Sequence, residues 1–180
     1  ADKVKASSLN AIAQLNSLGI ETAMLTGDNQ LTAEAIAREV GIKTVYADVL
    51  PADKSAKVQS LQSDKHIVGM VGDGINDAPA LAKATVGVSL SDASQIAMQS
   101  AQVVLMNHGI KNLPLALGLG KHTYITIKEN LFWAFAYNIV AIPVAAFGYL
   151  NPTFGALVMG LSDVVLAINS IRLNFKRVTR

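Results

Sequence analysis

Residues 72–81, Gly-Asp-Gly-Ile-Asn-Asp-Ala-Pro-Ala-Leu, decide how the first part of this chain folds. They follow the apolar run 66–71, which has the composition of a buried strand, and they lead into a helical pattern over residues 78–84. The glycines allow a sharp turn and a close approach of the backbone to a ligand. Asp73 and Asp77 lie four residues apart across this turn, a spacing that lets both carboxylates face one hard cation such as magnesium.

The same order of apolar run, polar turn and helix repeats along the first 114 residues. It predicts an α/β fold, a Rossmann-like parallel sheet with helices on both faces. The candidate linker is residues 107–114. The expected strands are 22–25, 44–46, 66–71, 86–88 and 103–106, and the expected helices are 4–18, 31–40, 54–61, 78–84 and 93–100.

Ligands of parallel α/β sheets gather at the carboxyl ends of the strands, so the turns at those ends carry the candidate chemistry. Thr26-Gly27-Asp28-Asn29 follows the strand 22–25 and offers a hydroxyl and backbone N–H groups that suit phosphate oxygens. Lys54, near the start of a helix, would add positive charge for a phosphoryl group. Each signal alone has a plainer explanation: a Gly-Asp turn is usually a solvated loop, and Asp73 with Asp77 also fits an N-cap followed by a first-turn acid. Together they predict one phosphate pocket.

Composition separates the chain into two parts. The 180 residues are 51% hydrophobic and 16% charged, and they contain no cysteine, which excludes a disordered tail, a disulfide scaffold and a cysteine-ligated metal domain. Residues 1–114 hold nine Lys/Arg and eleven Asp/Glu, whereas residues 115–180 hold six and two. We therefore expect a soluble domain over 1–114 and a membrane region over 115–180. The chain begins with Ala inside a helical pattern, so we expect it to be a piece of something longer.

The second part predicts a helical hairpin in a membrane. No charged side chain lies between Glu129 and Asp163, and a span needs about 20 apolar residues. We expect transmembrane helices at about 127–148 and 152–173, with basic residues flanking both outer ends and hence both chain ends in the cytoplasm. The alternative is a buried hairpin of a large soluble protein, which the 33 uncharged positions disfavour.

The chain resembles the P-type ATPases of the haloacid dehalogenase superfamily. The resemblance rests on residues 72–81, on Thr-Gly-Asp-Asn before them and on the membrane spans after them, and it covers the whole chain. It implies an ATP-driven cation pump. In this family Thr26 and Gly27 would hold phosphoryl oxygens, Asp28 would position the nucleotide, and Lys54 would neutralise an aspartyl phosphate.

The resemblance also implies a magnesium site, with Asp73 as a ligand and Asn76 and Asp77 supporting it. The nucleophile of the family lies in an Asp-Lys-Thr-Gly-Thr motif, which this sequence does not contain, and the actuator and nucleotide-binding domains are missing too. We therefore expect the fragment alone to be inactive. Two other functions stay open: a membrane-anchored phosphatase of the same superfamily, and a truncated, non-catalytic partner of a membrane complex.

The membrane part resembles the copper(I) exporters among the heavy-metal pumps. Tyr137-Asn138 matches their Tyr-Asn signature, and Met159 with Ser162 matches their Met followed by a serine pair, except that Asp163 replaces the second serine. A thioether suits copper(I), whereas Asp163 leaves silver, copper(II) or a divalent ion open. Plain packing of Met159 and Tyr137 is the alternative.

The resemblance further implies a bacterial plasma membrane location. The expected partners are membrane lipid, the remaining pump domains and a metallochaperone, with no nucleic acid among them.

Overall fold

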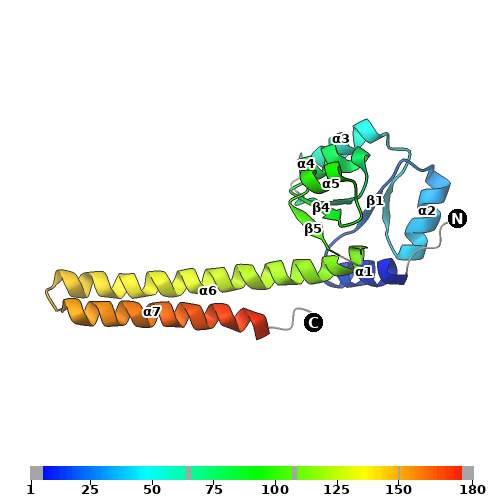
Figure 1. The fold of residues 1–180 in the computed structure, drawn as a ribbon. Helices are drawn as coiled ribbons and strands as arrows, with labels where there is room; N and C mark the ends of the chain where they lie inside the picture. Colours follow the sequence, from blue (N-terminus) through cyan, green and yellow to red (C-terminus); the bar gives the residue numbers. More distant parts are fainter. Residues whose placement is uncertain (1–5, 64–65, 107–108, 150, 176–180) are drawn as a thin grey trace. The chain divides into compact units, whose positions relative to one another are not determined.

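The computed structural model describes residues 6–63, 66–106, 109–149 and 151–175. The chain divides into two units, Ala1–Pro114 and Leu115–Arg180, which are called here the first and the second unit (Figure 1). Each is described by itself.

The first unit alternates helices with short strands. Its elements are α1 (Ala6–Ser17), β1 (Ala23–Leu25), α2 (Gln30–Val40), β2 (Thr44–Tyr46), α3 (Pro51–Ser63), β3 (Gly69–Gly72), the 3₁₀ turn η1 (Ile75–Asp77), α4 (Ala78–Lys83), β4 (Val86–Leu90), α5 (Gln95–Ser100), β5 (Val103–Leu105) and the 3₁₀ turn η2 (Gly109–Asn112).

All strand pairs in the described residues are parallel, which confirms the predicted fold class. They form two ladders, β1-β2 and β3-β4-β5, and no ladder joins β1 to β3 among the described residues. The two ladders nevertheless share a core. Leu25 of β1 and Met70 of β3 both pack against a buried cluster of Val58 in α3, Ala80 in α4 and Ala84, the C-cap of α4.

Local sequence signals explain where α2 and α3 begin and end. The Asn29 side chain caps α2 by accepting a hydrogen bond from the Thr32 N–H, and Gly41 ends the helix in the left-handed conformation at φ 83°. Helix α3 begins at Pro51, three residues before the predicted start at Lys54, because proline at a first helical position loses no hydrogen bond. Lys54 therefore lies within the first turn of α3.

The second unit contains the two long helices α6 (Leu113–Ala146) and α7 (Pro152–Arg172), followed by the short 3₁₀ turn η3 (Leu173–Phe175). Gly148 at φ 77° and the Asn151 cap of α7 make the break between them, close to the predicted position. Helix α6 begins at Leu113, well before the expected residue 127, because residues 113–126 continue a helical sequence with Pro114 in its first turn.

Among the described residues, one helical segment, Gly155–Phe175, has both the length and the hydropathy of a membrane span. Helix α6 is not among the segments that meet both conditions. The first of the two predicted spans therefore stays a prediction.

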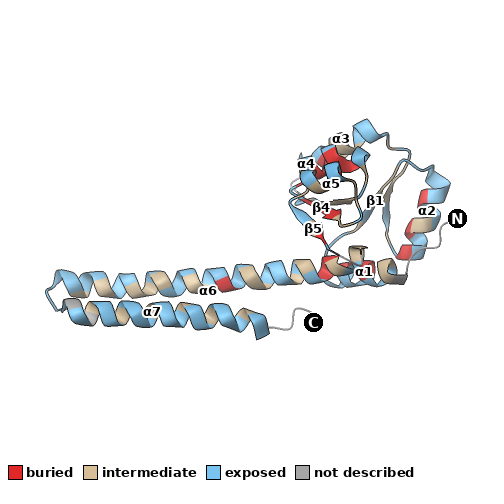
Figure 2. Ribbon diagram, in the orientation of Figure 1, coloured by how far each residue is buried: buried red, intermediate tan, exposed pale blue. Residues whose placement is uncertain are grey.

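Helices α6 and α7 run side by side in opposite directions (Figures 1 and 2), and hydrogen bonds from Asn130 to Ser170 and from Asn169 to Asn130 join them. Each helix carries one stripe of half-buried residues. The stripe is called here the seam. Its half-buried residues recur every three or four positions, the spacing of one helical face. They include Asn130, Ala134, Tyr137, Ala141 and Val144 of α6, and Gly155, Val158, Ser162, Leu166 and Asn169 of α7.

Candidate functional site

An ion pair connects the first turn of α3, which follows β2, with the 3₁₀ turn η1, which follows β3. The Lys54 Nζ lies 2.7 Å from Asp77 Oδ1, and the two side chains are only 16% and 12% exposed. Taking two charges out of water is costly unless they pair, so this contact fixes both side chains. Two of the predicted site residues, 23 positions apart in the sequence, are thus brought together.

The Gly-Asp-Gly turn explains how Asp77 reaches this place. The 3₁₀ turn η1 folds the chain back after β3, so that the Gly74 N–H donates to Asp77 Oδ2 at 3.2 Å. A Cβ on Gly72 would lie 2.7 Å from the Asp77 Cβ, closer than side chains tolerate. Only glycine at position 72 lets the Asp77 carboxyl pack against the end of β3.

The Thr26 turn after β1 is closed by its own hydrogen bonds. The Thr26 hydroxyl accepts from the Asp28 N–H at 3.1 Å and donates to Asp28 Oδ2 at 3.0 Å. Thr26 is half-buried, whereas Gly27 and Asp28 are exposed. The turn therefore presents backbone and hydroxyl groups to solvent at the carboxyl end of β1.

The loop after β2 supports the Thr26 turn, and the sequence analysis missed it. The Asp48 N–H donates to the Asp28 carbonyl at 2.8 Å, and the Val49 N–H donates to the Thr26 carbonyl at 3.0 Å. Asp48 adopts a left-handed φ of 52°, which is unusual for a residue with a side chain. The residues on either side of Asp48 are Ala47 and Val49, so the sequence has no glycine there that would have predicted the turn.

Asp73 follows β3 with an exposed carboxylate, and its backbone is held by a second residue that the sequence analysis missed. The Ser94 N–H donates to the Asp73 carbonyl at 2.9 Å, while the Ser94 hydroxyl caps α5. Asn76 is also exposed. The turn therefore exposes the Asp73 carboxylate and the Asn76 amide to solvent, beside the buried Asp77.

These contacts place the three turns at one edge of the first unit. The Thr26 turn is bonded to the loop after β2, that loop continues into α3, and Lys54 of α3 is paired with Asp77 beside Asp73. The donors at this edge are carboxylate, amide and hydroxyl oxygens, which fit magnesium. Both Asp77 oxygens already accept hydrogen bonds from the protein, so Asp73 is the carboxylate best able to bind a cation directly.

The candidate ion ligands of the second unit fall into two groups. Tyr137 and Ser162 lie on the seam and are half-buried. Asn138, Met159 and Asp163 are exposed; Met159 is 61% exposed, and the Asn138 side chain donates to the Ala134 carbonyl at 2.8 Å. The described residues contain no group of three or more His, Cys, Asp or Glu side chains placed to hold a metal ion. Helices α6 and α7 therefore present these ligands in two directions.

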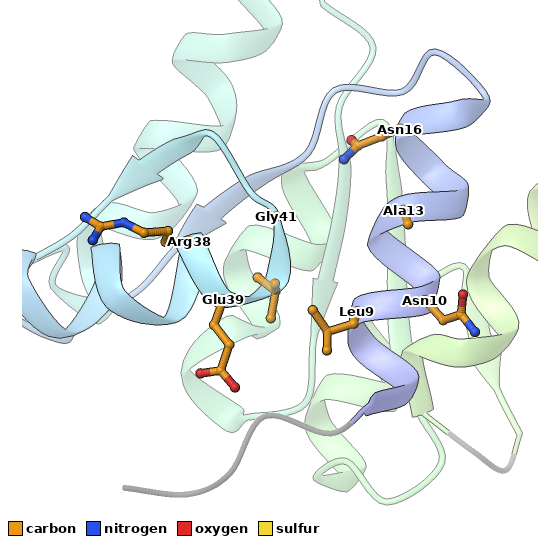
Figure 3. Close-up of a pocket in the computed structure, with 8 residues that line it drawn as sticks. Leu9, Asn10, Ala13, Asn16, Arg38, Glu39 and Gly41 are labelled. Carbon is orange, nitrogen blue, oxygen red and sulfur yellow. The ribbon is translucent and has the colours of Figure 1, made fainter.

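A surface groove between α1 and α2 is separate from all of these residues (Figure 3). It is lined by Leu9 and Asn16 of α1 and by Arg38 and Gly41 at the end of α2. Helix α2 starts after the Thr26 turn and ends at the opposite edge of the first unit, where Gly41 precedes β2. The groove is thus far along α2 from the candidate phosphate pocket.

Comparisons with known proteins agree with this architecture. Residues 1–85 match the haloacid dehalogenase-like hydrolase family. The chain is 50% identical over 173 residues to a copper-exporting P-type ATPase of Staphylococcus haemolyticus, and 46% identical over 178 residues to one of Staphylococcus aureus. These matches cover 96% and 99% of this chain but 22% of each relative.

A solved structure of a zinc-transporting PIB-type ATPase superposes with a TM-score of 0.89 at 31% identity, covering 96% of this chain and 28% of the other. The fold of both units is therefore found within a larger metal-transporting protein. By sequence and by fold, this chain is similar to one part of the metal-transporting P-type ATPases, and residues 1–85 of its first unit match the haloacid dehalogenase-like hydrolase family.

Proposed function

We propose that this chain supplies the magnesium- and phosphate-binding half of the phosphorylation domain, together with two membrane helices, to an ATP-driven pump that exports copper(I). The observation that carries the proposal is the shared edge at which Lys54, Asp77, Asp73 and the Thr26 turn are fastened together. The matched residues make up 22% of the length of each relative, so we propose the complete activity for a longer protein.

In the proposed phosphorylation step, a carboxylate oxygen attacks the terminal phosphorus of ATP, and the bond to the bridging oxygen of ADP breaks. Thr26 and the backbone of Gly27 hold the phosphoryl oxygens, and Asp28 positions the nucleotide. The Lys54 ammonium, kept in place by Asp77, offsets the negative charge of the aspartyl phosphate. Magnesium, held by Asp73 with support from Asn76 and Asp77, would neutralise charge on the transferred group.

The attacking carboxylate comes from outside this sequence, and the fold has a suitable position for it. Neither β1 nor β3 has a ladder on the side away from its partner among the described residues, although Leu25 and Met70 pack on the same core cluster. A strand between them would bring its carboxyl end to the edge that holds Thr26 and Asp73. This arrangement supports a nucleophile that is delivered by another part of the pump.

For the transported ion, Met159 offers a soft sulfur suited to copper(I), with Tyr137, Asn138, Ser162 and Asp163 as oxygen ligands. The exposed side chains among them would face further membrane spans of the pump. A divalent ion is the second candidate, because Asp163 adds a carboxylate and a zinc-transporting ATPase shares the fold. We place the pump in the bacterial plasma membrane with both ends of this chain in the cytoplasm. Lipid, the actuator and nucleotide-binding domains, and a metallochaperone are its proposed partners.

A domain exchange tests this proposal. This chain would replace the 173 matching residues of the Staphylococcus haemolyticus pump, and ATP hydrolysis would be measured with copper(I), silver or zinc. We expect stimulation by copper(I). In the same hybrid, Met159→Ala should lower copper stimulation much more than Asp163→Ser, because the second change removes no soft ligand.

The reverse order would make Asp163 the principal ligand. Stimulation by zinc without any by copper(I) would overturn the copper assignment and keep the pump. A hybrid that forms no phosphoenzyme under any metal, although it is inserted and folded, would contradict the proposed role of the first unit.

A further inference from the structure

A network of amide and hydroxyl groups joins α6 and α7 near the end of the hairpin that is remote from its loop. The Asn169 side chain donates to Asn130 Oδ1 at 2.8 Å, and the Asn130 side chain donates to the Ser170 hydroxyl at 3.0 Å. The Ser170 hydroxyl in turn donates to the Leu166 carbonyl at 2.9 Å. Every member therefore has a specific partner across or along the seam. The network is called here the amide clamp.

The amide clamp determines which residues face each other further along the hairpin. Both helices rise 1.5 Å per residue and they run in opposite directions, so equal steps away from the clamp reach equal depths. Tyr137 lies seven residues after Asn130, and Ser162 lies seven residues before Asn169. Seven residues are close to two full turns, so both side chains also stay on the seam, where they are half-buried.

The small and β-branched residues of the seam do little to fix this register. Ala134, Ala141 and Gly155 are small, and Val144 and Val158 are similar in shape, so a shift by one turn would replace one small residue with another. A shift would be costly at the clamp, because Leu166 or Leu173, one turn away on α7 and η3, would take the place of Asn169 opposite the Asn130 amide. A single buried Asn sets the register of coiled coils for the same reason.

We propose that the amide clamp of Asn130, Asn169 and Ser170 sets the register of α6 against α7 and thereby holds Tyr137 opposite Ser162. These three are positioning residues, since none of them is among the proposed ion ligands. The consequence for the ion rests on the proposed function, whereas the register itself does not.

Disulfide formation tests the register, and the absence of native cysteine makes the result unambiguous. The pair Ala141→Cys with Val158→Cys lies 11 residues from Asn130 and from Asn169, and so reports the native register. Two shifted pairs, Ala141→Cys with Gly155→Cys and Val144→Cys with Val158→Cys, report a slip of about one turn in either direction. Each pair would be made in the whole chain in lipid nanodiscs and oxidised with diamide.

We expect the native pair to form fastest. Asn130→Ala with Asn169→Ala should reduce its advantage over the shifted pairs about fivefold, the loss expected for interhelical hydrogen bonds in a membrane. Asn169→Gln, which keeps an amide donor, should retain most of the advantage. Asn174→Ala, an exposed residue just beyond α7, is the matched control and should retain all of it. Circular dichroism would show that each variant keeps its helices.

An unchanged preference in the double alanine variant would overturn the proposal. Copper(I) affinity, measured in the hybrid pump without introduced cysteines, separates this result from the fate of the proposed function. Weaker copper(I) binding by the hybrid after loss of the clamp, with all proposed ligands intact, is the expected outcome. A chain that slips as expected in a hybrid that never binds copper(I) would refute the copper site and leave the register inference standing.

Discussion

The Lys54–Asp77 ion pair allows a quantitative test of how the first unit holds its candidate site. Lys54→Met keeps the length of the side chain but leaves the Asp77 carboxylate, 12% exposed, with the Gly74 N–H as its one remaining partner among the described residues. Removing one member of a fully buried pair costs 3 to 5 kcal/mol in general, so the partial exposure here suggests a loss of about 2 to 3 kcal/mol. Asp77→Asn keeps the shape and an acceptor, and should cost about 1 to 2 kcal/mol.

The double variant should lose less than the two single variants together, with a coupling free energy of about 1 to 2 kcal/mol. Urea unfolding of the whole chain in detergent, followed by far-ultraviolet circular dichroism, gives the free energies, since membrane helices in micelles resist urea. Lys43→Met, at an exposed lysine, is the matched control and should change stability by less than about 0.5 kcal/mol. Additive losses in the double variant would show that the pair contributes nothing beyond its separate members.

Three further changes follow from the geometry of the turns. Gly72→Ala should lower the free energy of unfolding by about 1 to 3 kcal/mol, because its Cβ would lie 2.7 Å from the Asp77 Cβ. Gly74→Ala should lower it less, because the nearest contact of its Cβ would be 3.4 Å, and equal losses would refute the steric argument. Asp48→Gly should leave stability unchanged or raise it by up to about 1 kcal/mol because it removes the left-handed strain at φ 52°, and a clear loss in thermal unfolding would contradict that reading. In the hybrid pump, Asp73→Asn should abolish magnesium-dependent phosphoenzyme formation while metal binding by the membrane part persists, and normal phosphoenzyme levels would exclude Asp73 as the magnesium ligand.

The order of strands and helices in the first unit could be predicted because apolar runs and glycine-rich turns are local signals. The strand 44–46 and the end of α2 at Val40 were predicted without error. The end of a strand is harder to predict where its residues suit both a strand and a loop. His66 and Ile67 look like strand residues, yet β3 pairs only from Gly69 onward, where Val86 provides its partner.

The hydrogen bonds that hold the turns of the candidate site could not be predicted, because they join backbone groups that are far apart in the sequence. Any residue can donate a backbone N–H, so nothing in the sequence distinguishes Val49 or Ser94 as partners of Thr26 and Asp73. Asp73 and Asp77 looked equivalent in the sequence. In the structure one is exposed and the other is buried against Lys54, a difference that only the folded turn creates.

The separation of β1 from β3 also affects how the isolated chain should behave in solution. In the described part of the chain, each of these strands offers its backbone N–H and C=O groups on one side without a ladder partner. Open strand edges are templates for pairing with other extended chains, and lysine or proline in an edge strand opposes such pairing. Strands β1 and β3 are short, but neither contains a lysine or a proline. When residues 1–114 are produced alone, we therefore expect slow assembly into β-rich aggregates, even in the absence of the apolar hairpin. A short peptide that occupies either edge should delay that aggregation.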